Sequence, residues 1–220
     1  MYYENARKFI YQNARPLDIA RWKYLFENGS REEVLTALSE YQNEDGGFGS
    51  ALEPDCWNPN SSPVQTWVAT RIIKEINLED NNHPIIKGIL SYLSSGKDFD
   101  GHIWLNTVET NNAYPHAPWW NYEASQEKSY NPTASLIGFI LKFADKDSKI
   151  FHLACNLARE AYSYFKASFP LDSMHTVACF VELYEYLKES VIDDLVDIEE
   201  FGNLLNQQIK HMITGDTSRW

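Results

Sequence analysis

Residues 41–49 read YQNEDGGFG, and a weaker version of this stretch returns at residues 98–104 as DFDGHIW. The first copy follows a segment with helical periodicity and contains an acidic turn, the Gly46-Gly47 pair and the aromatic Phe48. Turns favour these residues, because glycine adopts positive φ at no steric cost and aspartate bonds to nearby backbone N–H groups. We therefore predict that both stretches are turns within a repeated structural unit, and that neither is the catalytic centre.

The segments around the two turns have the periodicity of α-helices, and no segment alternates convincingly as a strand does. Ser30 and Glu33 form a capping box, and Pro63, Pro84 and Pro132 suit first helical positions. Helices are expected over residues 30–42, 62–76, 83–93, 131–144, 149–167, 172–187 and 201–212, with two more over residues 1–28. The sequence therefore predicts a single all-α domain over residues 1–220.

Pairs of these helices repeat as hairpins, in units at about 30–77, 82–145 and 148–189 with flanking helices at 1–28 and 194–213. In register, Asp45-Gly46 matches Asp100-Gly101, and Thr66 matches Ser135 and Thr176. Such internal repeats are typical of architectures in which each unit packs on the next. The loops after the two turns, at 51–62 and 105–130, are long for a compact domain, so we expect any chemistry there.

The stretch LSEYQNEDGGFG, followed by a helix that begins P-x-x-[TS]-x-x-[small], resembles the repeat of the prenyltransferase and squalene-cyclase superfamily. The resemblance covers roughly residues 30–190 and is strongest in the first unit. It implies an α/α toroid, in which two concentric rings of helices surround a cavity that holds the ligand. About six hairpins close the ring in that superfamily, and this chain has fewer, so an incomplete or open ring is expected.

The superfamily's catalytic residues have weaker counterparts here. Protein prenyltransferases hold zinc with an Asp, a Cys and a His from distant repeats, and neither Asp55 nor Cys56 aligns with that pattern. Cyclases protonate an alkene with a DxDD motif, whereas Asp98 and Asp100 lie on the repeat's turn without the final Asp. The sequence therefore predicts no metal ion and no cofactor.

Glu53 and Asp55 follow the first turn and are flanked by Pro54 and Trp57. A carboxyl packed against apolar rings keeps its proton more easily, which suits a general acid, while its partner stays charged. We take both residues as candidate catalytic groups and Trp57 as a candidate binding residue. The alternative is that the carboxylates only cap backbone N–H groups of an ordered loop.

The second loop contains the densest chemical stretch, NNAYPHAPWWNYE at residues 111–123. His116 exchanges protons near neutral pH and is the third candidate catalytic residue. The candidate substrate-binding residues here are Tyr114, Trp119, Trp120, Tyr122 and Glu123. The alternative is a long loop stabilised by burying its own rings.

Two further signals are weaker. His175 opens a helix at the position that Gln65 occupies in the first unit, so a toroid would turn it toward the cavity mouth. A core or surface histidine is the alternative. Asp193, Asp194 and Asp197 match the DDxxD motif of isoprenoid synthases, but acidic residues in a first helical turn also favour the helix dipole. We read them as structural.

Composition narrows the partners and the compartment. A net charge of −12 argues against binding to nucleic acid or to an anionic membrane. Three cysteines without CxxC spacing, together with the lack of an apolar leader or membrane span, favour a cytoplasmic protein without disulfides. Aromatic residues make up 14% of the chain, which suits a small-molecule ligand held in a cavity. Nothing in the sequence indicates the oligomeric state.

Three functions fit these features. The first is a prenyltransferase-like or terpene-cyclase-like protein with an apolar or isoprenoid-type ligand in an acidic, aromatic cavity. There Asp55 or Glu53 donates a proton, His116 assists, and Trp residues stabilise a cationic intermediate. The second is a carbohydrate-active α/α barrel in which Trp residues stack on sugar rings and two carboxyls act as acid and base. The third is a binding scaffold without catalysis.

Overall fold

The computed structural model describes residues 2–125, 129–190, 192 and 194–213. Within these ranges all regular secondary structure is helical, which confirms the predicted all-α class. The α-helices are α1 (Tyr2–Asn13), α2 (Pro16–Phe26), α3 (Arg31–Ser39), α4 (Pro63–Glu75), α5 (Pro84–Ser94), α6 (Thr133–Phe143), α7 (Lys149–Ala167), α8 (Met174–Glu189) and α9 (Ile198–Met212). Two short 3-10 helices, η1 (Glu109–Ala113) and η2 (Pro118–Trp120), lie in the second long loop.

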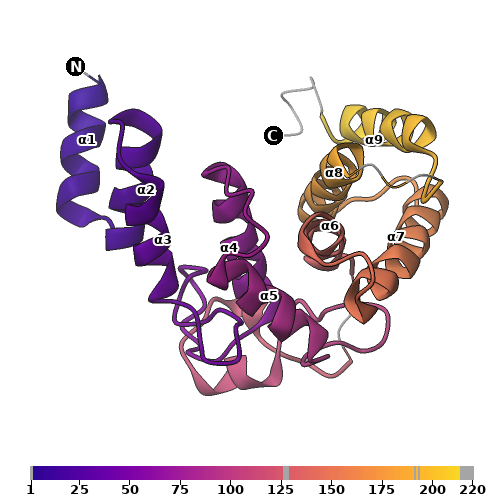
Figure 1. The fold of residues 1–220 in the computed structure, drawn as a ribbon, viewed down its shortest axis with the longest axis horizontal. Coiled ribbons are helices and arrows are strands. Elements are labelled where there is room, and N and C mark those ends of the chain that lie inside the picture. Colours follow the sequence, from indigo (N-terminus) through magenta and orange to yellow (C-terminus); the bar gives the residue numbers. More distant parts are fainter. Residues whose placement is uncertain (1, 126–128, 191, 193, 214–220) are drawn as a thin grey trace.

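The helices follow an open curve, with α1, α2 and α3 at one end and α7, α8 and α9 at the other (Figure 1). Helices α4 and α5 lie between these ends. The chain crosses the base of the curve in the long loops, so residues distant in sequence meet there (Figure 1).

Helix α6 is the centre of the hydrophobic core, and it packs against α7 and α8. Its sequence TASLIGFILKF is apolar on nearly every face, and a helix of this kind is stable only when surrounded. Gly138 allows α8 to approach closely, because a Cβ at this position would lie 2.5 Å from the Tyr186 ring. A small residue at this repeat position therefore has a packing role.

Most helix starts carry side-chain caps. Ser30 accepts a hydrogen bond from Glu33 N at 3.1 Å, which is half of the predicted capping box. Ser62, Ser148, Ser173 and Asp197 cap α4, α7, α8 and α9 in the same way. Helix α6 begins at Thr133, one residue later than predicted, because Pro132 occupies the N-cap position.

The repeat threonines tie the turns to the following helices. Phe48 N donates to Thr66 Oγ1 at 3.1 Å, and Trp104 N donates to Thr133 Oγ1 at 2.9 Å. The counterpart of Thr66 in hydrogen bonding is thus Thr133, not the Ser135 that the sequence register suggests. Ser135 instead donates to Glu182.

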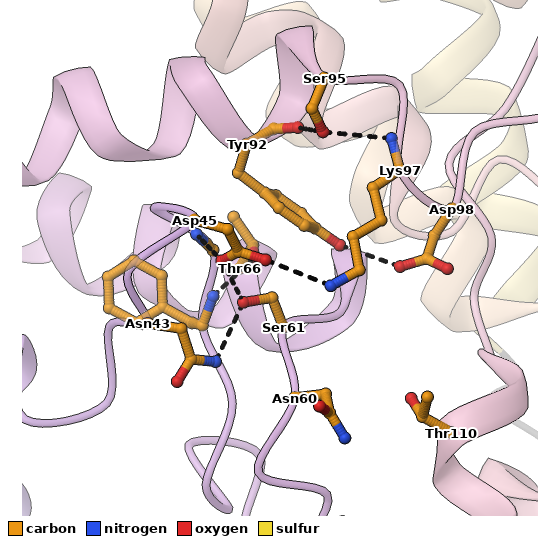
Figure 2. Close-up of polar contacts among 12 residues, drawn as sticks. Asn43, Asp45, Asn60, Ser61, Thr66, Tyr92, Ser95, Lys97, Asp98 and Thr110 are labelled. Atoms are coloured by element: carbon orange, nitrogen blue, oxygen red, sulfur yellow. Dashed lines mark hydrogen bonds and ion pairs between the residues drawn. The ribbon is translucent and has the colours of Figure 1, made fainter.

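The turn at residues 41–49 is held in place by the side chain of Asp45 (Figure 2). Asp45 Oδ1 accepts from Gly47 N at 3.0 Å and from Ser61 Oγ at 2.6 Å, and Oδ2 pairs with Lys97 Nζ at 3.2 Å. Gly46 has a φ of 86°, and a Cβ there would lie 2.2 Å from Gly88 O of α5. No L side chain fits this position without a shift of the backbone.

The second turn lies beside the first. Lys97 reaches back to Asp45, and the buried Tyr92 donates its hydroxyl to Asp98 Oδ2 at 3.2 Å (Figure 2). Burial, reinforced by the charge of Asp98, raises the pKa of Tyr92, so this hydroxyl stays a donor. In both turns the acidic side chains hold the architecture together.

Candidate active site

The two loops that follow the turns form one ordered unit. Asp55 O accepts from Ala117 N at 2.8 Å, and Trp57 N donates to Pro115 O at 2.9 Å. Cys56 and His116 pair between these bonds as an antiparallel bridge. Residues on the first loop are therefore fixed relative to the Trp119-Trp120 pair on the second.

Buried side-chain amides stabilise the contact between the two loops. Asn58 Nδ2 donates to Asn111 Oδ1 at 2.9 Å and to Thr110 Oγ1 at 2.8 Å. Asn111 Nδ2 in turn donates to Trp120 O at 3.0 Å. Both Asn58 and Asn111 are buried, so they can hold the loops only because their polar atoms are paired. Sequence reasoning missed both residues.

A pocket of about 630 Å³ opens between the paired loops, the middle of α4, the first turn of α8 and the residues just before α6. Its size is in the ordinary range for a small-molecule site. Its lining residues are Glu53, Asp55, Trp67, Arg71, Asn106, Trp119, Trp120, Asn131 and His175. Five of them are candidates from the sequence, namely Glu53, Asp55, Trp119, Trp120 and His175.

The two carboxyls of the pocket have different surroundings. Partial burial raises the pKa of Glu53, and the charge of Asp55 raises it further, while Arg15 and Arg71 act in the opposite direction. Asp55 Oδ1 accepts from Trp120 Nε1 at 2.5 Å. The pocket wall therefore holds two neighbouring carboxyls, one with a raised pKa and one bonded to a Trp ring N–H.

Arg71 and Trp67, both on α4, form another part of the lining. The Arg71 guanidinium lies over the Trp67 ring, 5.1 Å from its centroid, and its Nε is 3.2 Å from Glu182 Oε1. Glu182 Oε2 also accepts from Trp67 Nε1 at 3.0 Å and from Ser135 Oγ at 2.5 Å. Glu182, on α8, therefore links α4 and α6 to α8 through bonds to Trp67, Arg71 and Ser135.

Glu182 belongs to a neighbouring pocket of about 440 Å³, which shares Glu53 and Arg71 with the first. No sequence pattern selects Glu182 or Arg71, because each is a single charged residue on an amphipathic helix. Trp67 also lines the pocket, although it is only 9% exposed.

Asn106 carries an unusual polar atom. Its side-chain Oδ1 is buried and accepts no hydrogen bond from any residue within the described ranges. Buried polar atoms are nearly always paired, so an orphaned acceptor in a pocket wall calls for an explanation. The sequence offered no sign of it, because only the folded loop reveals which amides lack partners.

Five candidate residues from the sequence lie outside this lining. His116 Nδ1 lies 2.6 Å from Tyr114 O, so the two residues contact each other on the second loop. Trp57 is 61% exposed and donates its Nε1 to Pro54 O at 3.0 Å. Tyr122 N donates to Asn112 Oδ1 at 2.8 Å, and Glu123 is exposed and accepts from Asn121 Nδ2.

The acidic motif near the last helix has a structural role at the residue that caps α9. Asp197 Oδ1 accepts from Glu200 N at 2.8 Å and so caps α9. Asp193 lies outside the described residues, and Asp194 has a positive φ of 55° in the turn. Over the ranges that are described, no group of three His, Cys, Asp or Glu side chains is placed to hold a metal ion.

Within the described part of the chain, no helix has both the length and the apolar character needed to cross a bilayer. Cys56, Cys155 and Cys179 are free thiols.

In comparisons with known proteins, no family model, curated protein or solved structure matches the chain.

Proposed function

We propose that this protein is an acid–base enzyme that binds a small organic ligand in the Trp-lined pocket and protonates it from Glu53. The observation that carries the proposal is the pairing of Glu53 with Asp55 at the wall of that pocket, beside Trp119 and Trp120. General acids are found where the environment sets the pKa values of two neighbouring carboxyls apart. The pocket is also open to ligand, since side chains leave about 630 Å³ free.

The roles of the two carboxyls follow from their contacts. Glu53 donates its proton to a basic or unsaturated atom of the ligand and becomes a carboxylate. Asp55, oriented by Trp120 Nε1, stays charged and stabilises the positive charge that protonation creates. Arg71 lies close enough to lower the pKa of Glu53, so it favours the carboxylate left after proton transfer. The ligand cation then loses a different proton to solvent or is captured by water, and solvent returns a proton to Glu53.

We further propose that the helices form an open α/α toroid of the prenyltransferase and squalene-cyclase type. Support comes from the repeated link between a turn and the following helix, made by Thr66 in one unit and Thr133 in the next. The pocket includes His175 in the first turn of α8, the position that the toroid arrangement expects at the cavity mouth. A cytoplasmic location fits the net charge of −12 and the free thiols.

The superfamily resemblance favours an isoprenoid-type ligand, and three Trp rings suit a carbocation formed by protonation. The sugar-directed alternative uses the same proton donor. In both cases the reaction depends on the neutral carboxyl of Glu53. A scaffold that binds without reaction does not depend on it.

Native mass spectrometry of the full chain against isoprenoid diphosphates and oligosaccharides selects the ligand class, and turnover of that class is then measured. We expect Glu53→Gln to lower turnover roughly 100- to 10,000-fold, the usual contribution of a general acid. Glu109→Gln is the matched control, because Glu109 is exposed on η1 of the second loop, outside the pocket lining. Equal turnover by Glu53→Gln and wild type, or no ligand retained from either class, contradicts the proposal.

A further inference from the structure

The cationic side chains around Glu53 are paired with other carboxylates. The four ion pairs are Arg15–Asp18, Arg21–Glu75, Arg71–Glu182 and Lys74–Glu185, with N–O distances of 2.8, 2.7, 3.2 and 2.5 Å. Within the described ranges, Glu53 itself forms no ion pair with a Lys, Arg or His side chain. The other titratable groups that line the two pockets containing Glu53 are Asp55, His175 and Tyr186. A partly buried carboxyl without a cationic partner keeps its proton more readily.

Arg71 is the cation whose position matters most to Glu53, because the two side chains line both pockets together. The Arg71 Nε lies 3.2 Å from Glu182 Oε1, and the guanidinium lies over the Trp67 ring, 5.1 Å from its centroid. The other oxygen of Glu182 accepts from Trp67 Nε1 at 3.0 Å. One carboxylate therefore holds both the guanidinium and the ring on which it lies.

The two members of this ion pair differ in freedom. The side chain of Glu182 is only 18% exposed and also accepts from Ser135 Oγ at 2.5 Å, whereas that of Arg71 is 58% exposed. A long exposed side chain samples many rotamers unless a partner fixes it. Without the charge of Glu182, the carboxyls that remain beside Arg71 in the larger pocket are Glu53 and Asp55. Pairing with either one favours an ionised Glu53, because it adds positive charge there or offsets the charge of Asp55.

Asp18 holds a second guanidinium in a similar way. Arg15 Nε lies 2.8 Å from Asp18 Oδ2, and its terminal N–H donates to Ala51 O at 2.6 Å, two residues before Glu53. Burial and the charge of Asp55 raise the pKa of Glu53, although the charges of Arg15 and Arg71 act to lower it. The arginines are thus near enough to act on Glu53, yet their ion pairs lead elsewhere.

We propose that Glu182 is a positioning residue, which holds Arg71 so that the guanidinium does not pair with Glu53. Asp18 holds Arg15 in the same way. This inference rests on the proposed function, since it takes Glu53 as the proton donor. It goes further by assigning a role to two carboxylates that lie outside the lining of the larger pocket.

The test is the titration midpoint of the Glu53 carboxyl in the full chain, followed by carbon-detected NMR and assigned by Glu53→Gln. We expect Glu182→Gln to lower this midpoint, because the released Arg71 then favours the Glu53 carboxylate. Gln retains an oxygen that accepts from Trp67 Nε1 and Ser135 Oγ, so the variant should keep the fold. Its unfolding temperature checks this.

A double-mutant cycle shows whether Glu182 acts through Arg71. The direct effect of losing one negative charge persists in an Arg71→Gln background, whereas an effect carried by the guanidinium does not. We therefore expect Glu182→Gln to lower the midpoint clearly in the wild type and much less in Arg71→Gln. Glu189→Gln is the matched control, because Glu189 is also on α8, pairs with Lys142 at 2.9 Å and lines neither pocket that contains Glu53. It should leave the midpoint unchanged.

Asp18→Asn is an independent second test, and it decides alone if Glu182→Gln does not fold. We expect a lower Glu53 midpoint in it as well. The shift should be smaller than in Glu182→Gln, because Arg15 remains bonded to Ala51 O. An unchanged midpoint in these variants, or an equal shift by Glu182→Gln with and without Arg71, overturns the inference. A purely structural Glu182 would lower the unfolding temperature without this dependence on Arg71.

The titration needs no ligand, so it separates this inference from the proposed function. If the midpoint shifts as expected but the protein turns over neither isoprenoid diphosphates nor oligosaccharides, the acid–base function fails and the positioning role stands. If turnover is lost in Glu53→Gln but the midpoint of Glu53 does not respond to Glu182→Gln, the positioning role fails and the acid–base function stands.

Discussion

The turn at residues 41–49 and the pocket that begins at Glu53 are close in sequence but use their polar groups differently. In the turn, Asp45 is bonded to Gly47, Ser61 and Lys97 (Figure 2). In the pocket, the Asn106 acceptor is orphaned and the pKa of Glu53 is raised. The polar groups of the turn are bonded within the protein and build the architecture, whereas Glu53 lines a pocket that a ligand can enter.

The two copies of the turn sharpen this contrast. A Cβ on Gly46 would lie 2.2 Å from the backbone oxygen of Gly88, while a Cβ on Gly101 would meet nothing within 4 Å. Both glycines have positive φ, at 86° and 104°. Glycine is therefore required at residue 46 by both packing and backbone conformation, and at residue 101 by backbone conformation alone.

The largest effect is expected from Gly46→Ala. The new methyl group must displace the backbone of α5 and also occupy a left-handed conformation, which together cost about 3–5 kcal/mol. Urea unfolding of the full chain, followed by circular dichroism, measures this loss. A loss no greater than that of Gly101→Ala would show that the close approach to Gly88 does not constrain the turn.

Asp45→Ala should have an intermediate effect. It leaves the buried Ser61 hydroxyl without its acceptor and costs about 2 kcal/mol at neutral pH. Burial opposes ionisation of Asp45, but the bonds from Ser61 and Gly47 outweigh it and lower its pKa. A lowered pKa stabilises the fold above the unfolded-state value, and this contribution is lost as pH falls through the folded-state value.

Asp45→Asn tests that sign directly. The loss of unfolding free energy in Asp45→Asn relative to wild type should be largest at pH 7. It should shrink as the pH falls below about 4, where Asp45 of the unfolded chain takes up a proton. Unfolding midpoints across this pH range provide the measurement. A penalty that grows toward acid would mean that the Asp45 carboxylate does not stabilise the turn.

Gly101→Ala is expected to cost only about 1–2 kcal/mol, the price of a non-glycine residue in the left-handed region. No packing term is added, because the space around this position is open. The same urea experiment measures it beside Gly46→Ala. An equal or larger loss than at Gly46 would remove the distinction between the two turns.

The smallest effect on stability, and one of opposite sign, belongs to Glu53→Gln. A carboxyl whose pKa is raised in the folded state favours folding most when protonated, and this contribution is lost as pH rises through the folded pKa. Gln cannot ionise, so Glu53→Gln does not lose this contribution. We therefore expect it to unfold at a slightly higher temperature than wild type at pH 7. The difference should vanish below about pH 4. A lower unfolding temperature at pH 7 would argue for a structural Glu53.

Much of the helical architecture can be predicted from the sequence, because periodicity, Ser caps and Pro at helix starts are local signals. Helix α4 begins at Pro63 as expected. The carboxyl pair could also be found, since Glu53 and Asp55 are neighbours beside Trp57. Local signals do not reveal which side of the paired loops becomes the pocket, so Trp57 and Trp119 looked equivalent although only Trp119 lines it.

The remaining pocket residues depend on contacts between distant segments. Arg71 is one charge among several on α4, and Asn131 precedes α6 without a motif. They become pocket residues only because the second loop packs against α4 and the segment before α6. The orphaned oxygen of Asn106 is likewise a property of the folded loop. Neither composition nor spacing contains that information.

The central claim is that Glu53 is the proton donor of the pocket, and a carboxyl titration tests it most directly. Carbon-detected NMR of the full chain, with Glu53 assigned by Glu53→Gln, follows its side-chain carboxyl against pH. We predict a midpoint above the ordinary Glu value of about 4.3, and a lower midpoint in Asp55→Asn, which removes the neighbouring charge. A midpoint at or below the ordinary value in the wild type, unmoved by Asp55→Asn, would contradict the account.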